Sequence, residues 1–341
     1  MAVKKIGGQS LVFESRPCVA SWAAVVGPME GEGPLKSEYD MIMKDSLFDQ
    51  DSWEKAEQKM MQYSIELALK KADRLPWEMD YLLGGDLLNQ IITANFTARV
   101  FGAPFLGLYG ACSTLAEGMI LAGILIDGGY GDSVGAASCS HHDTAERQLR
   151  FPTEMGVQRS QTAQWTVTGS GAYLIRSGET GVRMTHATVG KVVDYGVKNA
   201  SDMGSAMAPA ALDTIRAHLE DTGRNAADYD YIITGDLGRR GFDSLKTLMA
   251  EEDLPANNLT DCGLHVYGGN QDTHSGASGC GCSAIVMGPR FFKEMRRWPR
   301  KKLLFAGTGA LLSPLTSFQG ESIPGIAHAI AFEWTEGENS K

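Results

Sequence analysis

One side chain in this sequence combines a reactive type with a position that suits nucleophilic chemistry, Cys112. Cys112 stands between two apolar segments, 104–109 and 113–126, which predict a buried strand followed by a buried helix. A side chain at such a corner projects beside the helix N-terminus, as the nucleophile of an elbow does. We therefore expect helix amides to lower the pKa of the Cys112 thiol and to offer donors to an anion. The alternative is a small residue that only packs the turn.

The other cysteines show no metal-site pattern. The chain has six cysteines and no CxxC pair, and a single residue separates Cys280 from Cys282 within a Gly/Ser/Ala run. Structural zinc sites combine such pairs with further cysteines or histidines at fixed spacing. We therefore expect free thiols in a reducing compartment, no resident metal and no other cofactor.

Composition narrows the class of protein. The chain has 341 residues, of which 43% are hydrophobic and 21% charged, and a formal net charge of −10 with a pI of about 5.2. An acidic chain is a poor candidate for a nucleic-acid binder, because such a protein must neutralise phosphates. The N-terminus lacks the apolar stretch of a signal peptide, and no apolar segment approaches the ~20 residues of a membrane span. These features favour a soluble protein inside a cell that meets a membrane through partners.

Strand and helix patterns alternate through the first half of the chain. Strands are predicted at 80–87, 104–109 and 133–138, and helices at 53–74, 94–100 and 113–126. This alternation favours a mostly parallel sheet with helices on both faces. Segment 141–163 is too polar and too long for a simple connection, which is typical of a lid or a binding loop.

The second half repeats the pattern of the first. Segment 230–237 reads Asp-Tyr-Ile-Ile-Thr-Gly-Asp-Leu and segment 80–87 reads Asp-Tyr-Leu-Leu-Gly-Gly-Asp-Leu, at an offset of 230 − 80 = 150 residues. A helix is predicted before each segment and another after it. An internal duplication of this kind predicts two similar halves. We place them at 1–190, with 141–163 as an inserted loop, and at 191–341.

Together these features resemble the thiolase and ketoacyl synthase superfamily. That superfamily has a cysteine between a core strand and a long buried helix, and a glycine-rich strand similar to segment 167–172. Its Gly-His-Pro-x-Gly-x-Ser-Gly motif is similar to Thr-His-Ser-Gly-Ala-Ser-Gly at 273–279, which has one residue fewer and no proline. The resemblance implies an α/β protein with the thiolase-like, duplicated, five-layered α-β-α-β-α architecture. It also implies that Cys112 and His274 stand at the catalytic cysteine and histidine positions.

Finer features resemble one family of that superfamily, stage V sporulation protein AD of spore-forming Firmicutes. They are Gly-Ala-Cys-Ser-Thr at 110–114, Arg-Phe-Pro-Thr-Glu-Met-Gly at 150–156 and Thr-Ala-Gln-Trp-Thr-Val-Thr-Gly at 162–169. The resemblance implies a peripheral protein of the forespore or spore inner membrane that works with other proteins of its operon. It implies a role in uptake or release of dipicolinic acid, largely as the calcium chelate. It also implies a homodimer joined through the first-half sheet.

The chain departs from ketoacyl synthase III relatives where the second-half strand ends. Those relatives have His-Gln-Ala-Asn at this place, and this sequence has Thr-Gly-Asp-Leu at 234–237. A carboxylate cannot donate a hydrogen bond to an oxyanion, so Asp236 leaves an incomplete catalytic set and disfavours carbon–carbon bond chemistry. The alternative role for Asp236 is to cap the following helix.

The leading interpretation is a binding protein for dipicolinate, a planar pyridine with two carboxylates. Such a ligand needs cationic or N–H donors and an apolar wall. The candidate ligand-binding residues are Cys112, His142, Arg147, Arg150, Gln164, Asp236, Asn270 and His274. The arginines could instead be solvated surface charges, and Asn270 a turn residue. Two other functions stay open: an acyltransferase with a thioester on Cys112, and a structural subunit of a membrane complex.

Overall fold

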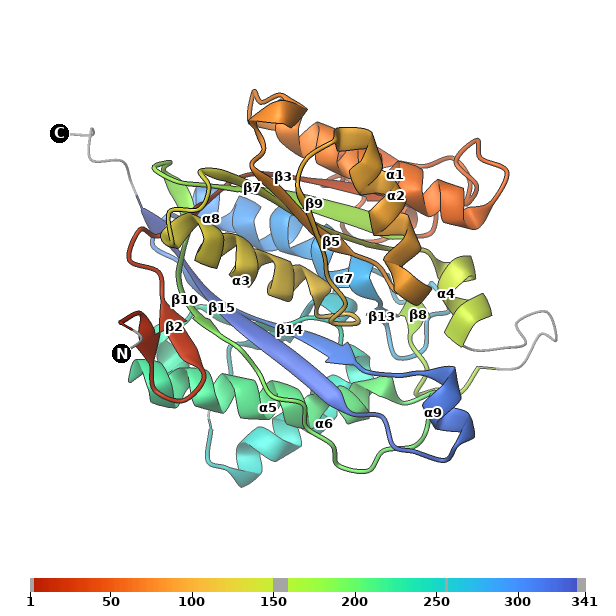
Figure 1. Cartoon of the computed structure of the whole chain (residues 1–341). Helices are drawn as coiled ribbons and strands as arrows, with labels where there is room; N and C mark the ends of the chain where they lie inside the picture. The colour runs from red at the N-terminus through yellow and green to blue at the C-terminus, as the bar shows by residue number, and fades with distance from the viewer. Residues whose placement is uncertain (1–2, 150–158, 255–256, 336–341) are drawn as a thin grey trace.

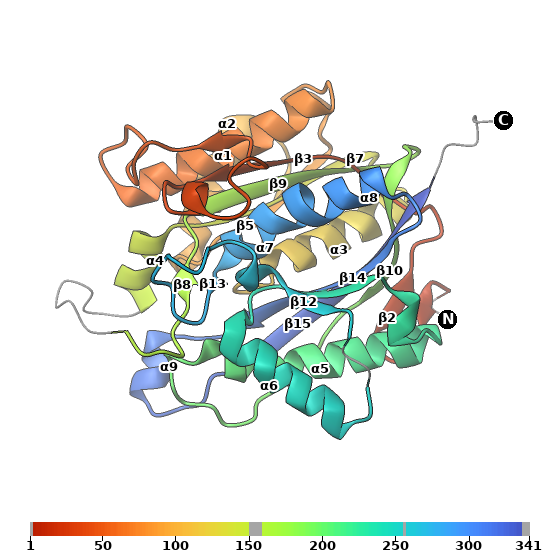
Figure 2. The same cartoon turned by 180° about the vertical axis from the view of Figure 1, so that it is seen from behind.

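Two β-sheets alternate with three layers of helices (Figure 1). The computed structural model describes residues 3–149, 159–254 and 257–335. One outer layer contains α1 (Trp53–Lys71) and α2 (Ile92–Phe101), and the other contains α5 (Met203–Thr222) and α6 (Gly238–Glu251). The middle layer contains α3 (Thr114–Asp127), α7 (Cys280–Val286) and α8 (Lys293–Arg297), seen from behind in Figure 2. The predicted five-layered arrangement is therefore confirmed.

The two sheets have the same strand order, which is the structural form of the duplication. The first sheet runs β6 (Phe105–Gly107), β5 (Tyr81–Gly85), β7 (Ser133–Ser140), β9 (Gly169–Arg176) and β3 (Cys18–Val26). The second runs β12 (Leu259–Asp261), β11 (Tyr231–Thr234), β14 (Lys302–Ala310), β15 (Gly325–Thr335) and β10 (Gly181–Thr188). In each sheet the first three strands are parallel and the last two pair antiparallel to their neighbours.

The sheets meet where β10 pairs with β3, at Val182–Val19 and Arg183–Cys18. The predicted boundary between the halves at residue 190 follows β10 in the sequence, and it stays a prediction. The remaining strands are short: β1 (Lys5–Ile6), β2 (Ser10–Val12), β4 (Met41–Ile42), β8 (Trp165–Thr166) and β13 (Ala277–Ser278). The remaining helices are α4 (His142–Leu149), α9 (Pro314–Phe318), the 3₁₀ turns at 30–32, 76–78, 89–91, 226–228 and 262–264, and a π turn at 287–292.

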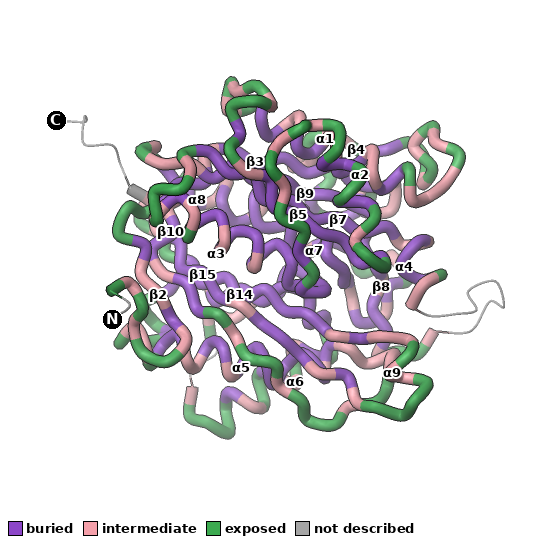
Figure 3. The backbone as a smooth tube through the Cα atoms, in the orientation of Figure 1, coloured by how far each residue is buried: buried purple, intermediate pink, exposed green. Residues whose placement is uncertain are grey.

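The middle helices are apolar because a sheet covers them on each side. α3 is rich in Ala, Gly, Ile and Leu, and most of its residues are buried. By contrast, α1 covers one face of a sheet and has buried residues such as Met61 and Ile65 among Lys and Glu. Figure 3 shows the same contrast, with buried backbone in the centre and exposed backbone along the outer helices.

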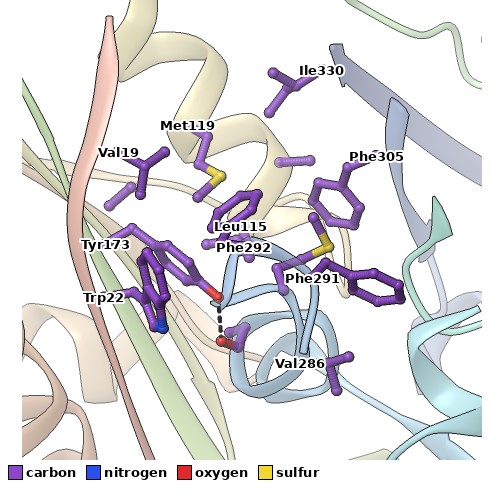
Figure 4. Packing of buried hydrophobic residues seen from close by; sticks show 14 of the residues in the cluster. Val19, Trp22, Leu115, Met119, Tyr173, Val286, Phe291, Phe292, Phe305 and Ile330 are labelled. Atoms are coloured by element: carbon purple, nitrogen blue, oxygen red, sulfur yellow. Dashed lines mark hydrogen bonds between the residues drawn. The ribbon is translucent and has the colours of Figure 1, made fainter. Parts of the chain in front are cut away.

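A cluster of aromatic side chains fills the space between the sheets beside α8 (Figure 4). Phe292 packs edge-on against Trp22, Tyr173 and Phe332. The buried hydroxyl of Tyr173 donates to the carbonyl oxygen of Ala284 at 2.6 Å, so this polar atom has a partner inside the core. In the described part of the chain, no helix has both the length and the apolar character needed to cross a membrane.

The insert differs from the predicted loop. Residues 142–149 form α4, whose Thr144 hydroxyl donates to the buried carboxylate of Glu57 on α1 at 2.8 Å. Ala145 is also buried, so one face of α4 belongs to the core. Residues 150–158 of the insert lie outside the described residues.

Candidate functional site

Cys112 lies in a tight bend between β6 and α3. The preceding residue, Ala111, has a positive φ of 50°, which is uncommon for a residue with a side chain. The carbonyl oxygen of Ala111 accepts hydrogen bonds from the Thr114 hydroxyl at 2.6 Å and from the Cys280 thiol at 2.9 Å. These contacts hold the bend that the sequence predicts, and they turn the Cys112 side chain towards the C-terminal half.

The thiol of Cys112 is in hydrogen-bonding contact with the carboxylate of Asp236, at the end of β11. Burial raises the pKa of Cys112 well above its ordinary value, and the charge of Asp236 raises this pKa further. The expected lowering of the pKa is therefore wrong, because loss of solvent and a facing carboxylate outweigh the helix amides. The structure presents Cys112 as a neutral thiol.

Asp236 is itself buried in the interior. Its carboxylate accepts from the Thr308 hydroxyl at 2.9 Å and from the Gly279 N–H at 3.0 Å. Burial nevertheless raises the pKa of Asp236 to about 6, although the hydrogen bonds from Cys112, Gly279 and Thr308 oppose this shift. Asp236 thus links the bend of one half to β14 and to the loop before α7 in the other.

The duplicated acids have different roles in the two halves. Asp86 accepts from the N–H groups of Leu88 and Ala94, each at 2.8 Å, and so caps α2. In the second half, Asp261 accepts from the N–H groups of Leu237 and Gly238 at the start of α6, at 2.8 and 3.0 Å. The alternative that Asp236 caps this helix is therefore wrong, since Asp261 does so and leaves Asp236 free to contact Cys112.

A small pocket opens above Cys112. Its cavity volume is about 30 Å³, enough for about two water molecules. It is lined by Leu87, Tyr109, Ala111, Cys112, Ala145, Glu146, Leu149, Thr166, Met203, Ser278, Gly279, Ala310 and Leu312. The polar side chains of this lining are hydroxyls, the Cys112 thiol and the carboxylate of Glu146. Among the described residues, no lysine or arginine lines the pocket.

A larger groove lies directly outside this pocket. The groove has a cavity volume of about 330 Å³ and shares Tyr109, Leu149 and Leu312 with the pocket lining. Its other walls include neutral hydrogen-bonding side chains such as Asn89 and Gln90. The shared residues therefore separate a ligand-sized outer space from the buried thiol.

Three predicted site residues belong to one buried assembly, Cys112, Asp236 and Gln164. The Gln164 amide donates to the carbonyl oxygens of Asp236 at 2.6 Å and Ala277 at 2.9 Å. Gln164 thus supports the backbone beside Asp236, and the pocket lining does not include it. Its predicted role in ligand binding stays a prediction.

His142 and Arg147, two predicted ligand-binding residues of the insert, are not part of the pocket lining. His142 stacks on Trp165 with ring centroids 3.9 Å apart, and Arg159 covers the same ring at 4.4 Å. Arg147 forms an ion pair with Glu54 of α1. Arg150 lies outside the described residues. The ligand-binding roles of His142, Arg147 and Arg150 stay predictions.

His274 lies in the loop that leads to β13, and its side chain is 13% exposed. Its Nδ1–H donates to the carbonyl oxygen of Ser160 at 2.7 Å, and its Nε2 is 3.1 Å from a carboxylate oxygen of Asp272. Among the described residues, no hydrogen bond or ion pair joins His274 to Cys112. Asn270 is exposed on a turn of the same loop. Their predicted catalytic and binding roles stay predictions.

Sequence reasoning missed residues that build the pocket. Thr308 holds Asp236, and Tyr109 and Leu312 form the boundary with the outer groove. Ser278 stood in segment 273–279, which carried the superfamily resemblance, and Thr166 stood in segment 162–169, which carried the family resemblance, so these segments could have pointed to both residues. No group of three or more His, Cys, Asp or Glu that could hold a metal ion occurs among the residues that the structure describes.

The layered fold and the cysteine bend define a thiolase-like protein. Solved structures similar to it include OleA of Xanthomonas campestris with cerulenin, at 13% identity and a TM-score of 0.61, covering 95% of this chain and 98% of that one. Another is 3-oxoacyl-[acyl-carrier-protein] synthase III of Aquifex aeolicus VF5, at 12% identity and a TM-score of 0.56, covering 93% and 100%. At these identities the likeness shows the fold alone.

The sequence matches the stage V sporulation protein AD family over residues 7–333. It is 45% identical over 336 residues to Stage V sporulation protein AD of Bacillus subtilis strain 168, covering 98% of this chain and 99% of that relative. The chain belongs to the stage V sporulation protein AD family.

Proposed function

We propose that this sporulation protein binds dipicolinic acid in a pocket inherited from an acyl-transfer scaffold and performs no acyl transfer. The observation that carries the proposal is the contact of the Cys112 thiol with the buried Asp236 carboxylate beneath a pocket and an outer groove. The family resemblance supplies the ligand.

Acyl transfer is disfavoured by the charge around the thiol. A thioester forms by attack of a thiolate, and the pKa of Cys112 is raised by burial and by the Asp236 carboxylate. A tetrahedral intermediate on Cys112 would also develop negative charge close to that carboxylate. An enzyme would need donors at this place, and Asp236 is an acceptor when ionised.

The pocket and the groove together match a planar diacid better than either does alone. The pocket has room for only about two water molecules, so a pyridine ring must lie in the groove. For part of the ligand to reach the pocket, the side chains of Tyr109, Leu149 and Leu312 between the two spaces must move aside. Tyr109 and Leu312 then supply the apolar wall. Asn89 and Gln90 in the groove supply neutral donors for a carboxylate.

Charge in the site favours the calcium chelate over the free dianion. The Asp236 carboxylate lies beneath the pocket, and no described lysine or arginine lines the pocket or the groove. A bare dianion would meet like charge at short range. In the chelate, the calcium ion neutralises the two carboxylates and offers open positions to oxygen ligands.

We further propose that the protein is a homodimer joined through the first sheet. β6 is the edge strand of that sheet. Beside it, Phe96 and Val100 on α2 and Leu106 on β6 are 48%, 50% and 46% exposed, which makes a paired apolar surface next to an open strand edge. A second copy of the chain would cover both features.

A docking role in a membrane-associated complex is the second candidate function. Leu315 and Phe318 on α9 are 67% and 81% exposed, directly after the groove residues Ser313 and Pro314. Exposed apolar residues at the rim of a binding groove favour contact with a protein partner. We propose that this protein lies at the inner membrane of the forespore or spore, and that other proteins of the same operon dock on α9.

Calorimetric titration of the purified chain with dipicolinate, with and without calcium, tests the proposed function. The variant Ala145→Leu fills the pocket from α4 and should weaken binding by about ten-fold or more, which is about 1.4 kcal/mol. Ala250→Leu makes the same change at an exposed position on α6 and should bind as the parent does.

Thermal melting would check that both variants keep the fold. Saturable binding that the pocket variant alone loses supports the proposal. Equal binding by all three proteins would move the ligand elsewhere, and absence of binding by the parent would reject the binding function for the isolated chain.

A further inference from the structure

A basic loop with an exposed tryptophan projects from one end of this acidic protein. Residues 296–302 read Arg-Arg-Trp-Pro-Arg-Lys-Lys, which gives five cations and no acid in seven residues of a chain whose net charge is −10. We call residues 296–302 the Trp298 loop. It connects the end of α8 to the start of β14.

Only some of these five cations contact other residues of the protein. Arg296 covers the ring of Trp22 at 4.1 Å, and Lys301 pairs with Glu294 at 2.5 Å. The side chains of Arg297, Arg300 and Lys302 are exposed and form no ion pair among the described residues. Lys293 and, less strongly, Arg297 lower the pKa of the Glu38 carboxyl, so Arg297 has an acidic neighbour beyond ion-pair distance, and all three side chains stay open to solvent.

The tryptophan of the loop is exposed in the same place. Trp298 is 64% exposed, although its N–H to Glu294 and its carbonyl to Lys301 fix its backbone at 2.9 and 3.1 Å. The backbone of Trp298 is fixed by hydrogen bonds while its aromatic ring is exposed to water, so packing within the fold does not explain this side chain. Tryptophan beside lysine and arginine is the side-chain combination that membrane interfaces favour.

We propose that the Trp298 loop docks this protein directly on an anionic phospholipid surface. Arg297, Arg300 and Lys302 would contact lipid phosphates, and Trp298 would insert at the level of the headgroups. Fluid headgroups can gather around a basic loop of seven residues. The rest of the chain is acidic, so the loop also sets the orientation of approach.

The Trp298 loop and the groove lie at opposite ends of the molecule. α8 lies at one end of the molecule, and the pocket and groove walls formed by α4 and the α9 segment lie at the other, in both Figure 1 and Figure 2. A protein docked through the Trp298 loop would keep its groove open to water. This inference does not depend on which ligand the groove takes.

Co-sedimentation of the full chain with vesicles tests the proposal. Vesicles of phosphatidylcholine with phosphatidylglycerol should bind the protein at low ionic strength, and vesicles of phosphatidylcholine alone should not. The triple variant Arg297→Gln/Arg300→Gln/Lys302→Gln should lose at least about ten-fold in partition to the anionic vesicles. Trp298→Ala should weaken partition with no change in net charge.

A matched control removes the same charge elsewhere. Lys44, Arg239 and Lys246 are exposed on other segments, and their triple change to Gln should leave vesicle binding as in the parent. Equal losses in the two triple variants would overturn the proposal, because net charge alone would then control binding. Failure of the parent to bind anionic vesicles would also overturn the proposal. An acidic protein would then be the partner that the loop binds.

Discussion

The thiol of Cys112 and the carboxylate of Asp236 meet across the two halves of the duplicated fold. Each residue follows a strand of a different sheet, and each has a raised pKa because the contact is buried. In an acyl-transfer site the nucleophile faces hydrogen-bond donors. Here it faces an acceptor, which makes the thiol a donor and a wall of the pocket.

This contact predicts a cysteine of low reactivity. Iodoacetamide should modify Cys112 at pH 8 about ten-fold or more slowly than a free thiol, because little thiolate forms. Asp236→Asn removes the facing charge and should speed the reaction. Peptide mapping by mass spectrometry gives the rate for Cys112 in the folded protein. Rapid labelling of Cys112 in the parent, or its acylation by an acyl thioester, would favour the acyltransferase alternative.

The exposed apolar surface of α2 and β6 predicts a dimer that would dissociate when acidic residues are introduced on this surface. Phe96→Glu with Val100→Glu should give monomers at concentrations where the parent is dimeric, because two copies would bury like charges at the interface. Analytical ultracentrifugation measures the change. Trp77→Glu alters a 78% exposed side chain elsewhere and should leave the dimer intact. A parent that is monomeric at all concentrations rejects this surface as a dimer interface.

Close packing at the cysteine bend predicts a strict requirement for Gly309. A Cβ at this position would lie 2.4 Å from the carbonyl oxygen of Gly110, which is backbone and cannot rotate away. Gly309→Ala should therefore lower the free energy of unfolding by about 1–3 kcal/mol. A Cβ on Gly269 meets nothing within 4 Å, so Gly269→Ala is the control. Denaturant titrations that show equal stability for both variants would contradict the packing.

A buried histidine predicts loss of stability in acid. Burial lowers the pKa of His218 from 6.5 to about 3, while its ring contacts Thr188 and Tyr229 at 2.8 and 2.6 Å. Below pH 6.5 the unfolded chain takes up a proton that the folded chain refuses, so stability is lost as the pH falls. The loss at pH 5 should be ~2 kcal/mol from this group.

The variant His218→Gln isolates that contribution. It should be less stable than the parent at pH 7, because it loses the ring contacts, and should lose less further stability between pH 7 and pH 5. Denaturant unfolding at the two pH values measures both effects. An identical pH dependence in parent and variant would show that His218 does not titrate on unfolding.

Much of the fold could be predicted from periodicity, and the errors have physical causes. Helices 53–74 and 113–126 were predicted within three residues of α1 and α3, because their apolar spacing is regular. The helices before and after segment 230–237 were predicted at 210–219 and 244–251, so the predicted starts of α5 and α6 were seven and six residues late. Gly204 and Gly241 lie in the missed first turns of these helices, where a Cβ on Gly204 would lie 2.9 Å from the Gly241 nitrogen. These glycines let two helices approach closely.

The site was predictable in position and less so in chemistry. Chain order placed Cys112 at a bend and Asp236 at a strand end, and the duplication brought both to the centre. The pKa of Cys112 was predicted in the wrong direction, because burial and facing charges depend on contacts between halves that no local pattern contains. The same limit applies to Thr308 and Leu312, which reach the site from distant strands and loops.

The most direct test of the central claim is a crystal structure of the protein grown with calcium and dipicolinate. The account predicts density for the pyridine ring in the groove between Tyr109 and Leu312, one carboxylate directed towards Thr166 and Ser278, and an unmodified thiol on Cys112. Ligand density at another place, or an empty groove at a saturating ligand concentration, would contradict it.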